Sequence, residues 1–246
     1  MQIKSSDGKT ITIGEDSAKG RLPLSIVLCI PGNQFSSVFN RCLLSTVDFF
    51  YSNNIKYSYS NQYSSVVHFA RSMCLGADLR RGIHQKPFDG KVQYTHLLWI
   101  DSDSVWTPQN LVDLLGRNVD VVAGHYLLHD QSGYATVSLK DWDLDYYKKN
   151  GKFKYLTDDD IKRETEKDKN ALIETAYTGF GFLLMKKGVM ESLDYPWFIS
   201  MALDAGDEVA DITSEDVSCC LRLREKGYKV WVDPKVRIGH EKKVVL

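Results

Sequence analysis

Two features are missing from this sequence: a strong excess of one charge and a long run of apolar residues. The 31 Lys and Arg residues nearly balance the 32 Asp and Glu residues, for a formal net charge of −1. This balance argues against the basic surface of a nucleic-acid-binding protein. No apolar run approaches the ~20 residues that span a bilayer, and residues 1–20 lack the apolar core of a secretion signal. We expect no nucleic-acid partner and no integral membrane segment.

Cysteine is scarce, with five residues in the chain and no Cys-x-x-Cys pair. An odd number of cysteines argues against a disulfide framework and suits a reducing compartment. Cys29 and Cys74 stand among apolar residues, which is typical of core positions. We therefore expect a cytoplasmic protein, and the sequence leaves a peripheral association with a membrane open.

The 246 residues and the 43% hydrophobic content are enough for one large α/β domain spanning residues 1–246. Short apolar runs predict strands, and apolar residues at helical spacing predict helices. Expected strands cover 25–30, 55–60, 96–100 and 119–124, and expected helices cover 37–51, 66–81 and 107–116. This alternation predicts a mostly parallel, Rossmann-like central sheet with helices on both faces.

The other segments are less regular. We expect residues 1–20 to form an N-terminal arm with a small strand at 10–13, and the charged residues 139–170 to form a polar insertion or a flap. Ser214 is a natural N-cap for the last helix, and Gly227 is well placed to end it. The remaining expected segments are a glycine turn and strand over 175–185, a short helix at 187–193, an irregular stretch at 194–213, and strands at 230–232 and 236–238.

The strand at 96–100 ends in Asp101-Ser102-Asp103, and this stretch organises the rest of the chain. Open α/β sheets bind ligands at the carboxyl ends of their strands. Side chains alternate along a strand, so Asp101 and Asp103 point at one spot if strand geometry continues through them. Carboxylate oxygens suit Mg²⁺ or Mn²⁺, although aspartates after a strand also serve as turn formers or helix caps.

Two later features supply partners for these carboxylates. Glu215 and Asp216 follow Ser214 at the start of the last helix, where acidic residues also simply complement the helix dipole. His240 stands near the end of the sequence, after a glycine. The order of these pieces resembles that of metal-dependent, nucleotide-sugar glycosyltransferases of the GT-A fold, in particular family-2-like members. The resemblance covers roughly residues 23–241 and implies a nucleotide-sugar donor, UDP-linked by family frequency.

The resemblance also implies roles for single residues. Asp103 and His240 would hold the metal, with Asp101 on the ribose or on metal-bound water. Imidazole together with carboxylate favours Mn²⁺ over Mg²⁺. Asp216 would be the general base of an inverting transfer, and Glu215 would bind the acceptor or the donor sugar.

Further residues are candidates for donor binding. The Pro31-Gly32-Asn33 turn would lie under the nucleotide base, and Arg71 would face the diphosphate. By the same resemblance, the remaining substrate-binding candidates are Ser102, the Gly179-Phe180-Gly181 turn beside the donor sugar, and Trp197 and Tyr126 stacked on sugar rings.

Three other functions fit parts of the pattern. A phosphatase of the haloacid-dehalogenase type would use Asp101 as its nucleophile, but its motif normally ends the first strand, whereas here three elements come before it. A nucleotidyltransferase would share the fold class, but no glycine-rich phosphate loop follows the first strand. A non-catalytic module that binds nucleotide sugars also remains open. The sequence does not indicate whether a glycan, a lipid or a protein is the acceptor.

Overall fold

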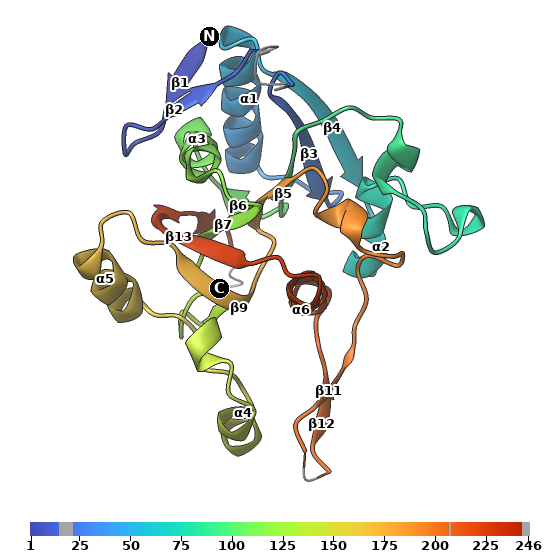
Figure 1. The fold of residues 1–246 in the computed structure, drawn as a ribbon, viewed down its shortest axis with the longest axis vertical. Helices are drawn as coiled ribbons and strands as arrows, with labels where there is room; N and C mark the ends of the chain where they lie inside the picture. Colours follow the sequence, from blue (N-terminus) through green and yellow to red (C-terminus); the bar gives the residue numbers. More distant parts are fainter. Residues whose placement is uncertain (15–21, 207, 243–246) are drawn as a thin grey trace.

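The computed structural model describes residues 1–14, 22–206 and 208–242. Its centre is an eight-stranded sheet in the order β4-β3-β5-β10-β7-β13-β9-β8 (Figure 1). The strands of this sheet are β3 (Ser25–Pro31), β4 (Lys56–Gln62), β5 (His96–Ile100), β7 (Val121–His125), β8 (Thr136–Ser138), β9 (Ile173–Thr178), β10 (Phe182–Lys186) and β13 (Val230–Arg237). The α/β class expected from the sequence is confirmed.

The sheet has parallel and antiparallel parts. Strand β3 is parallel to both β4 and β5, and β7 is parallel to β13. Strand β10 lies between β5 and β7 and is antiparallel to both of them. Strand β9 is antiparallel to β13 and to β8. The sheet is therefore mixed. The helical crossovers expected for a parallel sheet connect β3 to β4 through α1 (Ser37–Ser52) and β4 to β5 through α2 (Val67–Cys74).

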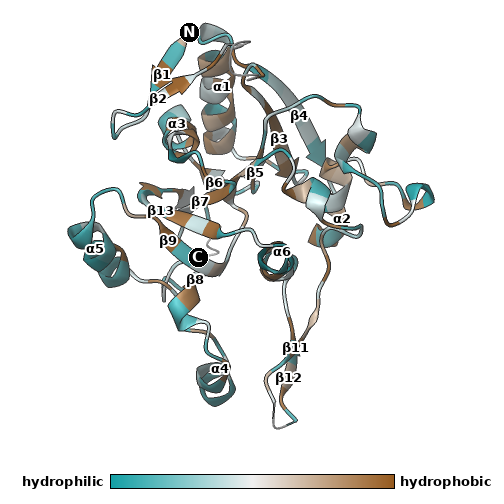
Figure 2. Cartoon of the chain, in the orientation of Figure 1, coloured by the Kyte–Doolittle hydropathy of each residue, from teal (hydrophilic) through white to brown (hydrophobic). Residues whose placement is uncertain are grey.

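Helices cover both faces of the sheet. They are α1 (Ser37–Ser52), α2 (Val67–Cys74), α3 (Pro108–Arg117), α4 (Leu144–Asn150), α5 (Asp158–Lys167) and α6 (Glu215–Glu225). One core cluster joins α2 and α6 to the sheet, and a second core cluster joins α1 and α3 to it. The sheet strands are mostly hydrophobic, whereas α4 and α5 are mostly hydrophilic (Figure 2).

Strand β5 shows why the sheet must be covered on both sides. Leu97 and Trp99 belong to the α2–α6 cluster, and Leu98 and Ile100 belong to the α1–α3 cluster. All four side chains are completely buried. Because alternate side chains point to opposite faces, a continuous apolar run needs a partner layer on each face.

Three expected elements have different limits. The helix expected over 66–81 ends at Cys74, because Gly76 adopts a positive φ of 72° that turns the chain. The helix expected at 187–193 is only one short 3₁₀ turn. The two strands expected within 230–238 form the single strand β13, whose register shifts between Val232 and Arg237. Within the described residues, the 3₁₀ turns are η2 (Leu79–Arg81), η3 (Pro87–Gly90), η4 (Leu139–Asp141) and η5 (Met190–Ser192).

The described part of the expected N-terminal arm is a docked hairpin. Strands β1 (Gln2–Lys4) and β2 (Thr10–Thr12) pair antiparallel. Ser6 donates two hydrogen bonds to Asp113 of α3, through its N–H at 2.6 Å and its hydroxyl at 2.8 Å. Residues 15–20 of the expected arm lie outside the described residues.

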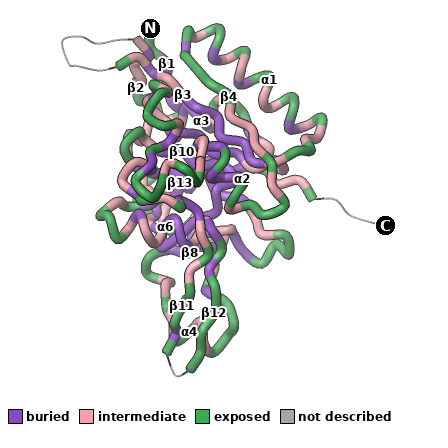
Figure 3. Tube along the Cα trace, turned by 90° about the vertical axis from the view of Figure 1, so that its right-hand side faces the viewer, coloured by how far each residue is buried: buried purple, intermediate pink, exposed green. Residues whose placement is uncertain are grey.

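Two segments project from the body on the side of α6. The charged range 139–170 contains η4, α4 and α5, and Trp142 stacks on Phe153 with ring centroids 4.3 Å apart. Residues 194–213, expected to be irregular, contain a hairpin of β11 (Ala202–Asp204) and β12 (Ala210–Ile212). Both projections are largely exposed (Figure 3), and Asp207 at the hairpin tip lies outside the described residues. Whether 139–170 acts as a flap stays a prediction.

One small pairing is important for the site. Strand β6 (Ser104–Val105) follows the Asp101-Ser102-Asp103 turn and pairs antiparallel with β14 (Gly239–His240). This pairing brings the end of the described chain back to the carboxyl end of β5. Within the described ranges, no helix combines the length and the apolar character that crossing a membrane requires.

Candidate active site

A cavity of about 930 Å³ opens at the carboxyl ends of β3 and β5. This is the edge of the sheet where open α/β proteins bind their ligands. The cavity collects most of the residues that the sequence pointed to, from six separate parts of the chain. The expected residues in its wall are Pro31, Gly32, Asn33, Arg71, Asp101, Ser102, Asp103, Tyr126, Glu215, Asp216 and His240.

Arg71 joins the two acidic motifs. Its Nη2 donates to Asp101 Oδ1 at 2.9 Å, and its Nε donates to Glu215 Oε1 at 3.0 Å. The guanidinium is almost fully buried and lies over the ring of Phe180, 5.3 Å from its centroid. Burial opposes this charge, but the carboxylates of Asp101 and Glu215 outweigh burial and raise the pKa of Arg71. Nη1 of Arg71 is buried and has no hydrogen-bond partner within the described ranges.

Asp103 faces a different set of partners. Its Oδ2 lies 2.8 Å from His240 Nε2 and accepts a hydrogen bond from Lys242 Nζ at 3.2 Å. The β6–β14 pairing sets His240 opposite Ser104, next to Asp103. Nδ1 of His240 lies 3.0 Å from the Leu127 carbonyl oxygen, an acceptor that assigns the proton to Nδ1.

The charges of this group support one another. Burial raises the pKa of Asp103, but its hydrogen bonds with His240 and Lys242 outweigh burial, so the pKa lies below its ordinary value. The bond to Asp103 in turn raises the pKa of His240 against the effect of burial. We therefore expect Asp103 to be ionised and to face the positive charge of Lys242.

The two aspartates do not share a partner. Strand β5 ends at Ile100, and a turn closed by the Ser104 N–H and the Asp101 carbonyl follows it. Strand geometry therefore stops before the aspartates, so the condition under which both carboxylates would point at one spot is not met, although both residues line the cavity. Asp101 binds Arg71, and Asp103 binds His240 and Lys242.

The residues present fit a divalent cation with two protein ligands. Asp103 and His240 converge with one carboxylate and one imidazole, a donor set that suits Mn²⁺. Among the residues that the structure describes, no group of three or more His, Cys, Asp and Glu side chains could hold a metal ion. The remaining ligands would have to come from the donor phosphates and water. Lys242 Nζ lies 2.6 Å from His240 Nε2, so the ammonium stands where the metal would bind.

Asp216 lies in the first turn of α6, beside Glu215. Its Oδ1 accepts hydrogen bonds from the Ser214 hydroxyl and from the Val217 N–H, the latter at 2.8 Å. Burial raises the pKa of Asp216, and the neighbouring Glu215 carboxylate adds to that rise. Ser214 occupies the N-cap position. Contrary to the expectation, its hydroxyl accepts no hydrogen bond from a backbone N–H of the helix. Instead, it orients Asp216.

Tyr126 fills the space that the glycine turn was expected to leave for a donor sugar. A Cβ at Gly179 would stand 1.9 Å from the Tyr126 hydroxyl, and a Cβ at Gly181 would stand 2.6 Å from its ring. The hydroxyl also accepts the Gly181 N–H at 3.3 Å. Gly179 and Gly181 thus make room for Tyr126, whose ring packs edge-on against His240 at 5.0 Å. The expectation that these glycines approach the donor is wrong.

Two expected aromatic contacts are also wrong. Trp197 is completely buried in the α2–α6 cluster, so neither face of its ring is open to a sugar. Phe180 is completely buried as well, beneath Arg71. Tyr126 has only 9% of its surface exposed and packs against His240, but it lies in the cavity wall, so its stacking on a sugar stays a prediction.

The loop after β3 forms the opposite wall of the cavity. Gly32 has a φ of 143°, and a Cβ there would stand 2.8 Å from Ser102 Cβ, so glycine permits this close approach. Asn61 Nδ2 donates to the Ile30 and Gly32 carbonyls at 2.7 Å each and holds the loop in place. At the far end of the loop, Ser36 donates to Glu241, whose N–H donates to the Asp103 carbonyl.

Sequence reasoning missed Lys242, Glu241 and Asn61. A signal for Lys242 was present, because it stands two residues after His240 and side chains two apart share one side of an extended segment. Glu241 and Asn61 act through contacts with residues far away in the sequence, and nothing near them indicates those partners.

No known family model and no curated protein sequence matches this chain. Its fold resembles that of many solved structures, among them the following three. The chain matches GalNAc-T7, solved with UDP, GalNAc and Mn²⁺, at 13% identity and a TM-score of 0.51, over 90% of this chain and 44% of that one. It matches A197 from STIV at 17% identity and a TM-score of 0.46, over 91% and 96% of the two chains. It matches the catalytic domain of Drosophila β1,4-galactosyltransferase 7, solved with xylobiose, at 10% identity and a TM-score of 0.47, over 89% and 71%.

At these identities the likeness concerns the fold. The chain spans less than half the length of GalNAc-T7. The chain therefore has a GT-A-like fold.

Proposed function

We propose that this chain is a glycosyltransferase that moves a sugar from a nucleotide-diphosphate sugar to an acceptor hydroxyl. The observation that carries this proposal is the cavity, which gathers Asp103 and His240 on one side and Glu215 and Asp216 on another. Arg71 lies in the same wall and pairs with Asp101 and Glu215. A volume of about 930 Å³ suits a ligand as large as a nucleotide sugar.

The donor would lie along the loop after β3 and the turn after β5. The loop residues Pro31, Gly32 and Asn33 would contact the nucleotide, for which UDP is our choice. The unpartnered Nη1 of Arg71 would bind an oxygen of the diphosphate or of the sugar, since a buried guanidinium needs its donors satisfied. Mn²⁺ on Asp103 and His240 would neutralise the charge on the departing diphosphate.

The acceptor would react next to Asp216. In an inverting transfer, the acceptor oxygen forms a bond to the anomeric carbon while the bond from that carbon to the diphosphate oxygen breaks. The electron pair of the broken bond leaves with the nucleotide diphosphate, and the acceptor proton passes to Asp216. The Ser214 and Val217 bonds go to Oδ1, and no bond to Oδ2 is found in the described part of the chain. Oδ2 is therefore the oxygen we assign to the acceptor proton.

The surroundings of Asp216 support this role. A general base works best when its pKa lies close to the working pH, and burial moves the pKa of Asp216 upward. Asp101, by contrast, is held by Arg71 through Oδ1. This contact stabilises its charge and makes it a poor phosphatase nucleophile.

The proposal is tested with a panel of nucleotide sugars. Purified chain is titrated calorimetrically with UDP- and GDP-sugars in Mn²⁺, and nucleotide release is then measured. We expect one donor to bind and to be turned over. Asp216→Asn should lower turnover by about 10²–10⁴-fold and leave donor affinity almost unchanged. Asp204→Asn, on the exposed hairpin, is the matched control and should change neither quantity. Failure of every nucleotide sugar to bind would refute the proposal.

A further inference from the structure

Helix α2 carries apolar side chains on its outer face. Val66, Phe69 and Met73 are spaced three and four residues apart, which places them on one stripe of a helix. All three are exposed, and Phe69 has 60% of its surface open. A surface helix ordinarily turns polar residues outward. Here the buried face contains Arg71, and the outer face is apolar.

The loop after α2 carries two more exposed apolar side chains. Leu79 and Ile83 are 83% and 58% exposed. The loop is held close to the end of the helix, because the Phe88 N–H donates to the Leu75 carbonyl at 2.6 Å. Gln85 closes the loop on itself through hydrogen bonds between its side chain and the backbone of Asp78 and Gly82. We call the five exposed side chains Val66, Phe69, Met73, Leu79 and Ile83 the α2 patch.

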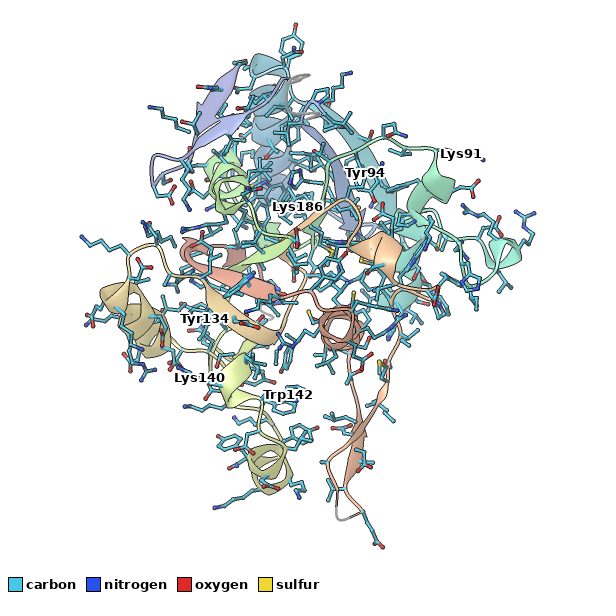
Figure 4. The ribbon with its side chains drawn as sticks, in the orientation of Figure 1. Lys91, Tyr94, Tyr134, Lys140, Trp142 and Lys186 are labelled. Carbon is cyan, nitrogen blue, oxygen red and sulfur yellow. The ribbon has the colours of Figure 1, made fainter. Side chains whose placement is uncertain are left out.

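Positive charge flanks the α2 patch, although the whole chain has a formal net charge of −1. The loop after α2 carries Arg80, Arg81, Lys86 and Lys91 against two acids, Asp78 and Asp89. The Lys91 side chain points away from the body of the molecule (Figure 4). The two loop acids pair with Arg80, Arg81 and Lys91, and the nearby Asp194 pairs with His84. Lys86 donates to the Glu191 carbonyl, and its charge also contributes to lowering the pKa of Asp194, so the loop's excess of positive charge is its four cations against its two acids.

The α2 patch lies beside the mouth of the cavity. Val67, next to Val66 on α2, and Tyr63, just before the helix, line the cavity and are themselves exposed. Helix α2 and the loop that follows it form the right-hand side of the molecule in Figure 1, and Figure 3 looks onto that side. A surface that docked on this side would therefore meet the cavity opening.

We propose that the α2 patch docks the protein on an anionic membrane surface. The apolar side chains would enter the headgroup region, and the loop cations would lie near lipid phosphates. Exposed apolar groups gathered in one place mark interaction surfaces. Apolar side chains flanked by Lys and Arg match the layered chemistry of an anionic lipid interface. Docking is independent of the proposed sugar transfer, so its test does not require activity.

The test is co-sedimentation of the full chain with vesicles of phosphatidylcholine, with and without phosphatidylglycerol. We expect binding to the anionic vesicles and clearly weaker binding to the neutral ones. Phe69→Ser/Leu79→Ser/Ile83→Ser should weaken binding at least tenfold. The matched control is Leu44→Ser/Tyr51→Ser/Ile212→Ser, which changes three exposed apolar residues elsewhere and should bind like wild type.

Each other outcome overturns the proposal. These outcomes are no binding of wild type to anionic vesicles, and equal losses in the two triple variants. Should the patch variant melt at a lower temperature than wild type, Leu79→Ser alone is measured, and an unchanged affinity then counts against the α2 patch. Sedimentation equilibrium without lipid examines a second copy as occupant. A dimer that the patch variant abolishes, together with no vesicle binding, would assign the patch to self-association instead.

Discussion

Replacing Arg71 with Met would remove the cation that links the two acidic motifs. Arg71 is 3% exposed, and the side chains of its partners Glu215 and Asp101 are 9% and 28% exposed. Breaking a buried ion pair costs about 3–5 kcal/mol, because the remaining charge stays buried without its partner. Water can reach Asp101, so the lower end, about 3 kcal/mol, is expected here. For a chain of this size that corresponds to a fall in Tm of roughly 6–12 °C.

The measurement is urea unfolding of the full chain at pH 7, followed by circular dichroism. Lys167→Met is the control, since Lys167 pairs with Glu164 at 3.1 Å and 63% of the Lys167 side chain is exposed. Exposed pairs contribute about 0–1 kcal/mol, so this control should lose little. Adding Asp101→Asn and Glu215→Gln to Arg71→Met should recover most of the loss, because no unpaired charge remains. A loss in Arg71→Met no larger than that in Lys167→Met would refute the buried-charge reasoning.

The remaining predictions concern pH and ligands. Because burial raises the pKa of Asp216, its ionisation costs the folded state free energy, so the free energy of unfolding should fall as pH rises from the ordinary Asp value through that pKa. Asp216→Asn should abolish this fall in the free energy of unfolding. The wild-type turnover rate should rise over the same pH range. An unchanged pH profile of urea unfolding in the variant would contradict the raised pKa of Asp216. UDP should raise Tm in Mn²⁺ more than in EDTA, and equal shifts by thermal melting would exclude a metal bridge. Lys242→Gln should strengthen Mn²⁺ binding in calorimetry without donor, since Lys242 lies on Asp103 and His240, whereas Lys229→Gln should not. Aryl phosphate should not be hydrolysed, and turnover that Asp101→Asn abolishes would support the phosphatase alternative.

Local patterns were sufficient for the class of fold and for most of the site. The apolar run of β5 has all of its leucine, tryptophan and isoleucine side chains buried, and this required a covering layer on each face. The acids after β5 and at the start of α6 lie at the cavity because both positions are strand or helix ends, which sequence signals mark directly. His240 reached the same cavity, although only its order in the chain pointed there.

Tertiary structure decided what each of these side chains contacts. Asp101 and Asp103 are separated by one residue, but the turn after Ile100 sends one to Arg71 and the other to His240 and Lys242. Arg71 comes from α2, His240 comes from β14, and Lys242 comes from the residues just after β14. These residues are far from the two aspartates in the sequence, so no local pattern indicates the contacts.

Burial was also decided by the whole fold. Trp197 was expected at a sugar, but its large apolar surface is buried in the core, where it gains more than at an open cavity wall. Gly179 and Gly181 lack side chains because Tyr126, from a different strand end, occupies that space. Sequence alone determined which chemistry the chain carries, since residue types and their periodicity are local. Only packing decided which of those groups remain open to a ligand, because burial depends on every element at once.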